Sequence, residues 1–599
     1  MIAREALRLG FGFLLPVLGL GLTACVLGRT AMRWSFLGIE TAGRLERWAV
    51  SAALGLGLVA HLLLLLGLAH LLRPVPVLLL AAGIHALGIP AWRELARDLQ
   101  PGWRWGIAVT AIVAVTPLVL LALYPPTAFD ATLYHLPFAR AFVESGGVPY
   151  LLDRRVPVFP QVNEILFAAV MLFGPDVAAH GVQLLMTLLS AALAVEWGGR
   201  TFPDRPWVGW LAAAIFLGNP IVVYLASTGY IEAGLTLFVT AGLYGLDRWR
   251  AGGGRGWLIL AAVLIATACD VKYLGLFFLG VAGLGVLLAG RGRTVPARLR
   301  DGLLFGAVGL AFLAPWYLRI YAFSGDPLFP FLPRIFGANL WAPTKVPEPQ
   351  QPHGDHLAHW LRLPWDLVFR RELYNQQPPF SPFYLPAIPL LLWGAVRDRW
   401  VRAALLVAGI YTLVFTFLPP DGRYLEPILP LASVAVAASL AIAFDVRIPR
   451  RAIAALCLLC FLPGWLYAGY RMRKQGPLPV TPAQRESYLS RSLPFYPAVA
   501  WLNRTRGSAY TVWALHAESM AYLAHGRFLG DWFGPAGFAR VLSGVRTPED
   551  LERKLRGLGA DHLLVTENGG LPFPEDGAFR RWFTPLYADA HARVYALRP

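Results

Sequence analysis

Asp130 is an acidic residue at a position where charge is costly. It follows an apolar run from Gly106 to Leu123 and lies at the start of the stretch Phe129 to Phe138. A carboxylate next to a membrane helix is seldom retained without a role. At the membrane surface it could accept a proton from a substrate hydroxyl. Because Asp also caps helices, a purely capping role is the alternative.

A second acid and an acid–base pair occur in later apolar segments. Glu232 follows Thr228-Gly229-Tyr230 at the start of an expected helix, where an acid is favourable for dipole reasons alone. Asp270 and Lys272 interrupt an apolar stretch from residue 258 to 288. They could be a mutually neutralised structural pair. We favour a ligand role, with Lys272 binding a phosphate and Asp270 holding that lysine.

Three arginines are further candidates for binding an anion. Arg154 and Arg155 follow Asp153 in the first large loop, and their planar guanidinium groups suit a phosphate. Arg423 lies in the later turn Asp421-Gly422-Arg423-Tyr424. The alternative for Arg423 is a tight turn whose arginine is anchored at the head-group level.

A metal site is the weaker interpretation of one histidine cluster. His353, Asp355, His356 and His359 could present ligands to a divalent ion from a helix. The neighbouring Pro352-Gly354 backbone disfavours that helix, so a solvated loop is the preferred interpretation. The sequence therefore predicts no particular cofactor. A divalent metal is the alternative. The 4 cysteines lack suitable partners, and no glycine-rich phosphate loop or Gly-x-Ser-x-Gly motif occurs.

The composition predicts what must position these residues. Of the 599 residues, 56% are hydrophobic and only 15% are charged, and the mean hydropathy is +0.53. Apolar runs long enough to span a bilayer recur over the first four-fifths of the chain. They predict an α-helical polytopic membrane protein with about 13 to 14 transmembrane helices. A net charge of +17 would suit a nucleic-acid partner, but the arginines are dispersed in short loops, so we exclude that partner.

The arginine clusters predict the membrane topology. They fall in alternate loops, within residues 200–205, 248–255, 291–300, 397–402 and 447–451. Because Lys and Arg collect in cytoplasmic loops, the intervening segments share the opposite, outer side. Asp130, Glu232 and Arg423 are on that side, as are the loops 125–163 and 324–382. The protein is therefore expected in a bacterial inner membrane, in contact with lipid and with its site facing outward.

Three regions are expected along the chain. Residues 1–104 would hold extra N-terminal transmembrane helices, and residues 105–475 the main membrane domain. Residues 476–599 would form a small outer-side soluble α/β domain, with strands at 510–515 and 562–566 and a helix at 551–558. An apolar run at 165–197 is expected to be a single span. In the first outer loop, His135 is expected to face water while Phe138 and Phe142 lie in the membrane interface.

The order of these motifs resembles the membrane-embedded glycosyltransferases of the C superfamily. The likeness is to bacterial members of family 39, related to protein O-mannosyltransferases and lipid A aminoarabinose transferases. It covers about residues 105–445. It is carried by Phe129-Asp130 with Tyr134-His135-Leu136-Pro137, Gly229-Tyr230-Ile231-Glu232, Asp270-Val271-Lys272-Tyr273, Ser324-Gly325-Asp326-Pro327-Leu328-Phe329-Pro330 and Gly422-Arg423-Tyr424-Leu425-Glu426-Pro427.

The resemblance implies a function and a role for each group. The donor would be a polyprenyl-phosphate-linked sugar, transferred on the outer (periplasmic) face to a glycan, lipid or protein acceptor that the sequence does not specify. Asp130 would be the catalytic base, and Glu232 would orient an acceptor or a metal. The donor phosphate would be bound by Lys272, Arg154, Arg155 and Arg423. Supporting positions in the same motifs are Tyr134, His135, Asp270, Tyr273 and Tyr424.

Two features depart from the family pattern, and two other functions compete. Many members carry paired acids in the first loop, whereas Ala131 follows Asp130 here. About three extra apolar segments also precede the usual first helix. One alternative is a transporter or flippase of lipid-linked or polar solutes, although such proteins place their ions at the membrane midplane in repeated halves. The other is a non-catalytic assembly protein for an envelope polysaccharide.

Overall fold

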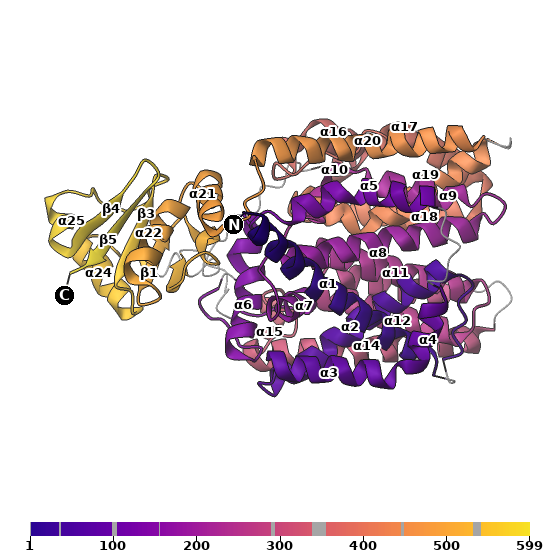
Figure 1. Ribbon diagram of the computed structural model, residues 1–599, viewed down its shortest axis with the longest axis horizontal. Helices are drawn as coiled ribbons and strands as arrows, with labels where there is room; N and C mark the ends of the chain where they lie inside the picture. Colours follow the sequence, from indigo (N-terminus) through magenta and orange to yellow (C-terminus); the bar gives the residue numbers. More distant parts are fainter. Residues whose placement is uncertain are drawn as a thin grey trace.

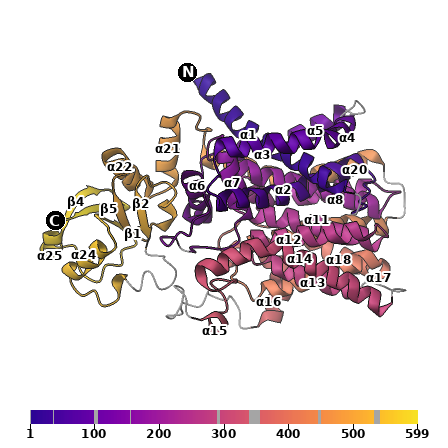
Figure 2. The same ribbon diagram turned by 90° about the horizontal axis from the view of Figure 1, so that it is seen from below.

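The protein consists of a long helical body and a smaller C-terminal lobe at one end of it, as a computed structural model shows (Figure 1). The structure describes residues 2–34, 37–98, 105–154, 156–288, 294–337, 355–444, 449–530 and 541–598. Figure 2 gives a second view, in which α6 and α7 again lie at the end of the body that adjoins the lobe.

The helical body is that of a multi-pass membrane protein. Among the described residues, 6 helices are long and apolar enough to cross a membrane, or 7 if the bent pair α3 and α4 is one span. That pair bends by 74° at its break. The predicted class is confirmed, while the total of 13 to 14 spans stays a prediction because several helices are short. The 6 long ones are α1 (Ile2–Met32), α2 (Arg44–Leu68), α8 (Ala178–Thr201), α14 (Val295–Ser324), η3 with α19 (Gly422–Ala443) and α20 (Arg450–Gln475).

The remaining helices of the body are shorter. They are α3 (Pro74–Leu87), α4 (Ile89–Asp98), α5 (Trp105–Ala122), α6 (Leu136–Ser145), α7 (Val162–Met171), α9 (Trp207–Leu217), α10 (Pro220–Leu225), α11 (Glu232–Arg250), α12 (Arg255–Val271), α13 (Gly275–Leu288), α15 (Pro333–Phe336), α16 (His356–Phe369), η2 (Arg371–Leu373), α17 (Tyr384–Arg397) and α18 (Arg399–Phe415).

The N-terminal helices pack into the body closely through small residues. A Cβ on Gly28 of α1 would lie 1.9 Å from the Ser51 carbonyl oxygen of α2, and one on Gly55 would lie 1.7 Å from that of Ala24. Membrane helices approach this closely only where glycine or another small residue forms the contact. Helix α2 also packs on α8, α7 and α12. This packing places α2 beside the two helices that carry Glu232 and Lys272.

The loop after α5 is folded into the protein. Residues Ala131–His135 form a π-helical turn, η1, which continues into α6. His135 is only 2% exposed, and Phe138 and Phe142 are fully buried. The expectation of an interfacial segment with a water-facing His135 is therefore wrong, because other protein elements cover both faces of this helix.

The apolar run at 165–197 is also not the single span expected. It is divided into α7 and α8 by a turn at Gly174-Pro175. A Cβ on Gly174 would lie 2.3 Å from the Gly12 carbonyl oxygen of α1, so the turn packs directly on that helix. Proline removes a backbone donor and disfavours a helical conformation at the residue before it, which accounts for the break.

The C-terminal lobe is an α/β domain with a five-stranded sheet in the order β2-β1-β3-β5-β4. Strand β1 is parallel to β2 and β3, whereas β5 is antiparallel to β3 and β4. The two predicted strands and the helix before the second are confirmed. The elements are α21 (Pro482–Ser492), α22 (Tyr496–Arg506), β1 (Thr511–Leu515), η4 (Glu518–Met520), β2 (Arg527–Gly530), α24 (Pro548–Gly557), β3 (His562–Thr566), α25 (Gly577–Trp582), β4 (Phe583–Ala588) and β5 (Ala592–Leu597).

The two faces of this sheet bury different surfaces. Trp513 and Leu563 belong to a core shared with α24 and α25. Val512 and Leu564, on the opposite face, belong to the cluster that extends into the helical body. Alternate residues of a strand point to opposite faces. The β1 pattern therefore provides one face for the lobe's own core and one for the cluster shared with the body.

Candidate functional site

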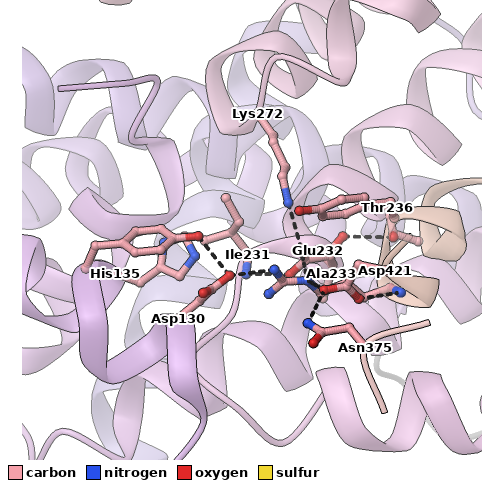
Figure 3. A network of polar contacts seen from close by, with 12 residues as sticks. Asp130, His135, Ile231, Glu232, Ala233, Thr236, Lys272, Asn375 and Asp421 are labelled. Atoms are coloured by element: carbon pink, nitrogen blue, oxygen red, sulfur yellow. Dashed lines mark hydrogen bonds and ion pairs between the residues drawn. The ribbon is translucent and has the colours of Figure 1, made fainter. Parts of the chain in front are cut away.

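Asp130 belongs to a buried network of charged side chains (Figure 3). It precedes η1 and is 8% exposed. Its Oδ2 atom accepts a hydrogen bond from the Tyr134 hydroxyl at 2.9 Å and pairs with Arg423 Nη2 at 2.5 Å. The spacing of four residues places Tyr134 on the same side of the turn as Asp130, whereas Arg423 comes from η3 (Gly422–Ile428).

Arg423 joins three acidic side chains. Besides Asp130, its Nε atom lies 2.9 Å from Asp421 Oδ2 and 3.6 Å from Glu232 Oε1. The guanidinium carbon lies 4.7 Å from the centre of the Tyr230 ring, where a cation–π interaction is favourable. Three carboxylates around one cation compensate for the cost of burying it. This arrangement fixes the guanidinium firmly.

Lys272 is the second cation of the network and the more accessible one. Its Nζ atom donates a hydrogen bond to Glu232 Oε1 at 2.8 Å and lies 4.2 Å from the centre of the Tyr424 ring. Its side chain is 22% exposed, compared with 8% for Arg423. Lys272 is the C-cap of α12 and has extended backbone there, while Glu232 begins α11. The end of α12 and the start of α11 therefore bring the Lys272 and Glu232 side chains together.

The charges around Asp130 determine its proton affinity. Burial raises the pKa of Asp130, but Arg423, with a smaller effect from His135, more than offsets this and lowers that pKa to about 2. The carboxylate is therefore ionised at neutral pH and is a weak base as long as Arg423 pairs with it. A ligand that weakens the pairing of Arg423 with Asp130 would raise the pKa of Asp130.

Part of this network lies in a segment that matches a known family. The model for dolichyl-phosphate-mannose-protein mannosyltransferase matches residues 162–290, which include Glu232 and Lys272 but neither Asp130 nor Arg423. A second family model, described as SF2091/S2213, matches residues 484–596 in the C-terminal lobe. No curated protein matches the chain.

Two solved structures share the overall arrangement. ArnT from Cupriavidus metallidurans in the apo state is 14% identical, with a TM-score of 0.53, and the match covers 82% of this chain and 97% of that one. The same protein bound to undecaprenyl phosphate gives 14% identity and a TM-score of 0.54, covering 83% and 98%. The chain has the fold of a C-superfamily glycosyltransferase. The resemblance predicted from the motifs is thus confirmed at the level of the fold.

In the structure, Asp270 does not form an ion pair with Lys272. Its Oδ2 atom lies 3.5 Å from His61 Nε2 of α2, and Lys272 pairs with Glu232 instead. The predicted pairing is wrong because the backbone becomes extended at Lys272, which turns that side chain away from the helix surface carrying Asp270. His61 also faces the carbonyl oxygens of Gly57 and Phe312 at 2.8 and 3.0 Å.

Two other supporting residues have partners outside the central network. The Tyr273 hydroxyl donates to the Phe329 carbonyl at 2.7 Å, so it connects α12 to the Ser324–Pro330 motif. His135 Nδ1 pairs with Glu164 Oε1 of α7 at 2.5 Å, beneath the Tyr134 ring. Both residues contribute to the site by fixing the elements around it.

Arg154, in the first large loop, has charged neighbours other than those of the central network. Arg155 falls outside the described residues. Arg154 is half-buried, and burial lowers its pKa to about 10, although nearby Asp153 acts in the opposite direction. Its other charged neighbours are Arg140 and Glu144. A phosphate-binding role for Arg154 therefore stays a prediction.

Two of the candidate metal ligands, Asp355 and His356, have structural partners. Asp355 caps α16 by accepting from the backbone N–H groups of Leu357 and Ala358, and His356 stacks on Phe417 with ring centres 3.9 Å apart. His353 lies outside the described residues. Among the residues that the structure does describe, no three His, Cys, Asp or Glu side chains gather as a metal site. Asp130, Glu232 and Asp421 each pair with a cation, so these three carboxylates do not form a vacant set of metal ligands.

Asp421, Asn375 and Tyr230 are the network members that sequence reasoning did not assign. Asn375 Nδ2 donates to Asp421 Oδ2 at 3.1 Å, which links the network to the segment after η2. In the sequence, Asp421 is two residues before Arg423, and Tyr230 is two residues before Glu232. Nothing in the sequence around Asn375 signals its position.

Proposed function

We propose that the protein is an inverting glycosyltransferase that moves a sugar from a polyprenyl-phosphate-linked donor to an acceptor hydroxyl on the outer face of the bacterial inner membrane. The observation that carries the proposal is the buried network in which Asp130 and Glu232 meet Arg423 and Lys272. Such a network combines a base with cations for a leaving phosphate. The family match over residues 162–290 and the C-superfamily fold support this choice.

The chemistry assigns the base to Asp130. The acceptor hydroxyl gives its proton to the Asp130 carboxylate while its oxygen forms a bond to the anomeric carbon of the sugar. The bond between that carbon and the phosphate oxygen breaks, and its electrons leave with the lipid phosphate. Attack from the face opposite the phosphate inverts the anomeric centre. A positioned base of this kind contributes roughly 10²- to 10⁴-fold in rate.

The leaving phosphate would be stabilised first by Lys272. Its ammonium is the more exposed cation and uses one donor on Glu232, so other donors are available to a phosphate oxygen. Arg423 is enclosed by three carboxylates and mainly positions Asp130. A donor phosphate close to Arg423 would weaken its hold on Asp130 and raise the basicity of that carboxylate. Donor binding would thereby prepare the base for the acceptor.

An outward-facing reaction follows from the predicted topology. The predicted topology places Asp130, Glu232 and Arg423 outside the cytoplasm. In the structure, η1, which follows Asp130, contacts the C-terminal lobe. A lobe on the outer side can take part in acceptor recognition without crossing the membrane.

Reconstituted protein provides the test. Purified full-length protein in liposomes is incubated with undecaprenyl-phosphate hexoses, pentoses and amino sugars, together with a membrane extract as the source of acceptor. We expect release of undecaprenyl phosphate together with transfer of the sugar, and an inverted anomeric centre in the product. Movement of a solute or lipid across the bilayer with every glycosidic bond intact would instead indicate a transporter.

A further inference from the structure

We propose that the C-terminal lobe positions the catalytic base, and that Tyr522 is the residue through which it does so. The inference rests on the proposed role of Asp130. Tyr522 follows η4, and η4 packs on η1, the turn that begins directly after Asp130. The lobe thus contacts the element on which the orientation of the base depends.

The closest connection is a backbone hydrogen bond. The Tyr522 N–H donates to the Thr132 carbonyl oxygen at 3.0 Å. Within the π-helical turn the Leu136 N–H donates to Ala131, and the next residue, Pro137, has no N–H to offer. The Thr132 carbonyl therefore takes its hydrogen bond from the lobe. A buried carbonyl left without a donor would be costly, so this contact has a structural consequence.

Several side chains fix Tyr522 in this place. Arg140 of α6 donates to the Tyr522 carbonyl and, at 3.1 Å, to the Ala524 carbonyl, and its guanidinium carbon lies 4.2 Å from the centre of the Tyr522 ring. The Tyr522 hydroxyl donates to Asp176 Oδ2 at 3.2 Å. Asp176 lies in the turn between α7 and α8. It also accepts hydrogen bonds from both terminal nitrogens of Arg485 in α21, at 3.1 and 2.5 Å.

Electrostatics strengthens this connection at neutral pH. Burial raises the pKa of Asp176, but Arg485 more than offsets the effect and keeps that pKa below its ordinary value. The Asp176 carboxylate is therefore ionised. It accepts hydrogen bonds from Arg485 and Tyr522, which both belong to the lobe. Tyr522 itself is only 4% exposed. The result is a buried contact from the lobe to η1, α6 and the turn between α7 and α8, in which the hydrogen bonds of Arg140 and Asp176 are charge-assisted.

The consequence for the reaction follows from the position of Thr132, two residues after Asp130. If η1 moves by about 1 Å, the Asp130 carboxylate moves relative to Arg423 and to an incoming hydroxyl, and such a displacement can cost on the order of 10²-fold in rate. Lys272 and Glu232 belong to helices α11 and α12, which η1 does not carry. Loosening Tyr522 should therefore slow turnover while leaving donor binding nearly unchanged.

The test compares full-length variants at the same interface. Tyr522→Ala removes the ring that Arg140 covers, whereas Tyr522→Phe keeps the ring and loses only the hydrogen bond to Asp176. Arg527→Ala is the matched control, because it breaks a half-exposed ion pair between the lobe and Asp153 in the same outer loop. We expect kcat to fall about 10- to 100-fold for Tyr522→Ala, with the donor KM within about 3-fold. Tyr522→Phe should lose less activity than Tyr522→Ala, and Arg527→Ala should stay close to the wild type.

A readout independent of activity is hydrogen exchange in residues 131–138. These amides should exchange faster in Tyr522→Ala than in Arg527→Ala, while peptides from the lobe's sheet stay protected. If the sheet of Tyr522→Ala loses protection, Arg140→Gln replaces it as the deciding variant, since it loosens the same contact from the body.

Wild-type kcat in the deciding variant, or unchanged exchange in residues 131–138, would overturn the proposal. So would an Arg527→Ala variant that loses as much activity as Tyr522→Ala. If the wild-type protein transfers no sugar, the proposed function fails, but the exchange measurement still decides whether the lobe orders η1.

Discussion

Replacing Asp130 with asparagine should separate catalysis from folding and from donor binding. The amide keeps the shape of the side chain but cannot accept the acceptor's proton, so transfer should fall by roughly 10²- to 10⁴-fold. Arg423 remains neutralised by Asp421 at 2.9 Å and by Glu232 at 3.6 Å. No buried charge is left alone, and the variant should insert and fold.

The stability cost can be worked out from the proton affinity of Asp130. Burial opposes ionisation, yet Arg423 lowers the pKa of Asp130 from its ordinary 3.8 to about 2. At 1.36 kcal/mol for each pKa unit, the ionised form contributes about 2 kcal/mol. Because the folded pKa is lower than the unfolded one, this contribution is complete above pH ~4 and is lost as the pH falls toward ~2. The melting points of wild type and Asp130→Asn should therefore differ by a few degrees at neutral pH and converge in acid.

The assay measures sugar transfer, undecaprenyl phosphate binding and thermal unfolding on the same purified samples. Donor affinity should be equal to or tighter than that of the wild type, because one nitrogen of Arg423 is released. Glu144→Gln provides the control, since it neutralises an exposed carboxylate on α6 of the same outer loop. Transfer by Asp130→Asn within tenfold of the wild type would refute the assignment of the base. Loss of the folded protein from the membrane would show that the residue is structural.

Two further substitutions test the neighbouring ion pairs. Lys272→Met removes the accessible ammonium, and because a hydrogen bond to a charged group contributes about 1.5–3 kcal/mol, undecaprenyl phosphate binding should weaken by roughly 10- to 100-fold; unchanged affinity would contradict the role given to Lys272. His61→Ala leaves the fully buried Asp270 without its partner, so the protein should lose about 1–3 kcal/mol of stability, seen as a lower melting point that a second change, Asp270→Asn, restores in part. An unaltered melting point for His61→Ala would mean that Asp270 is compensated elsewhere.

The class of the protein could be predicted from the sequence because it depends on local properties, and the same properties carry the prediction of the side on which the site lies. Long apolar runs have one stable environment, the bilayer, and arginines between them are confined to one side. A charged residue within such a run is conspicuous since its burial is costly. Asp130, Glu232 and Lys272 were recognisable for that reason. Two of the five strands of the C-terminal lobe, and the helix before the second of these, followed from their short apolar periodicities.

The pairing of those charges was decided only by the tertiary structure. Arg423 is 293 positions from Asp130, and His61 lies in a helix whose apolar sequence gives no sign that it faces Asp270. An ion pair forms wherever the packed helices bring two side chains within about 4 Å, and that distance is set by glycine contacts and helix breaks far along the chain. The hydrogen bond from Tyr522 to Thr132 depends in the same way on a lobe that folds at the other end of the sequence. The sequence alone shows where a buried charge would be costly, whereas the packing of the helices determines which partner neutralises it.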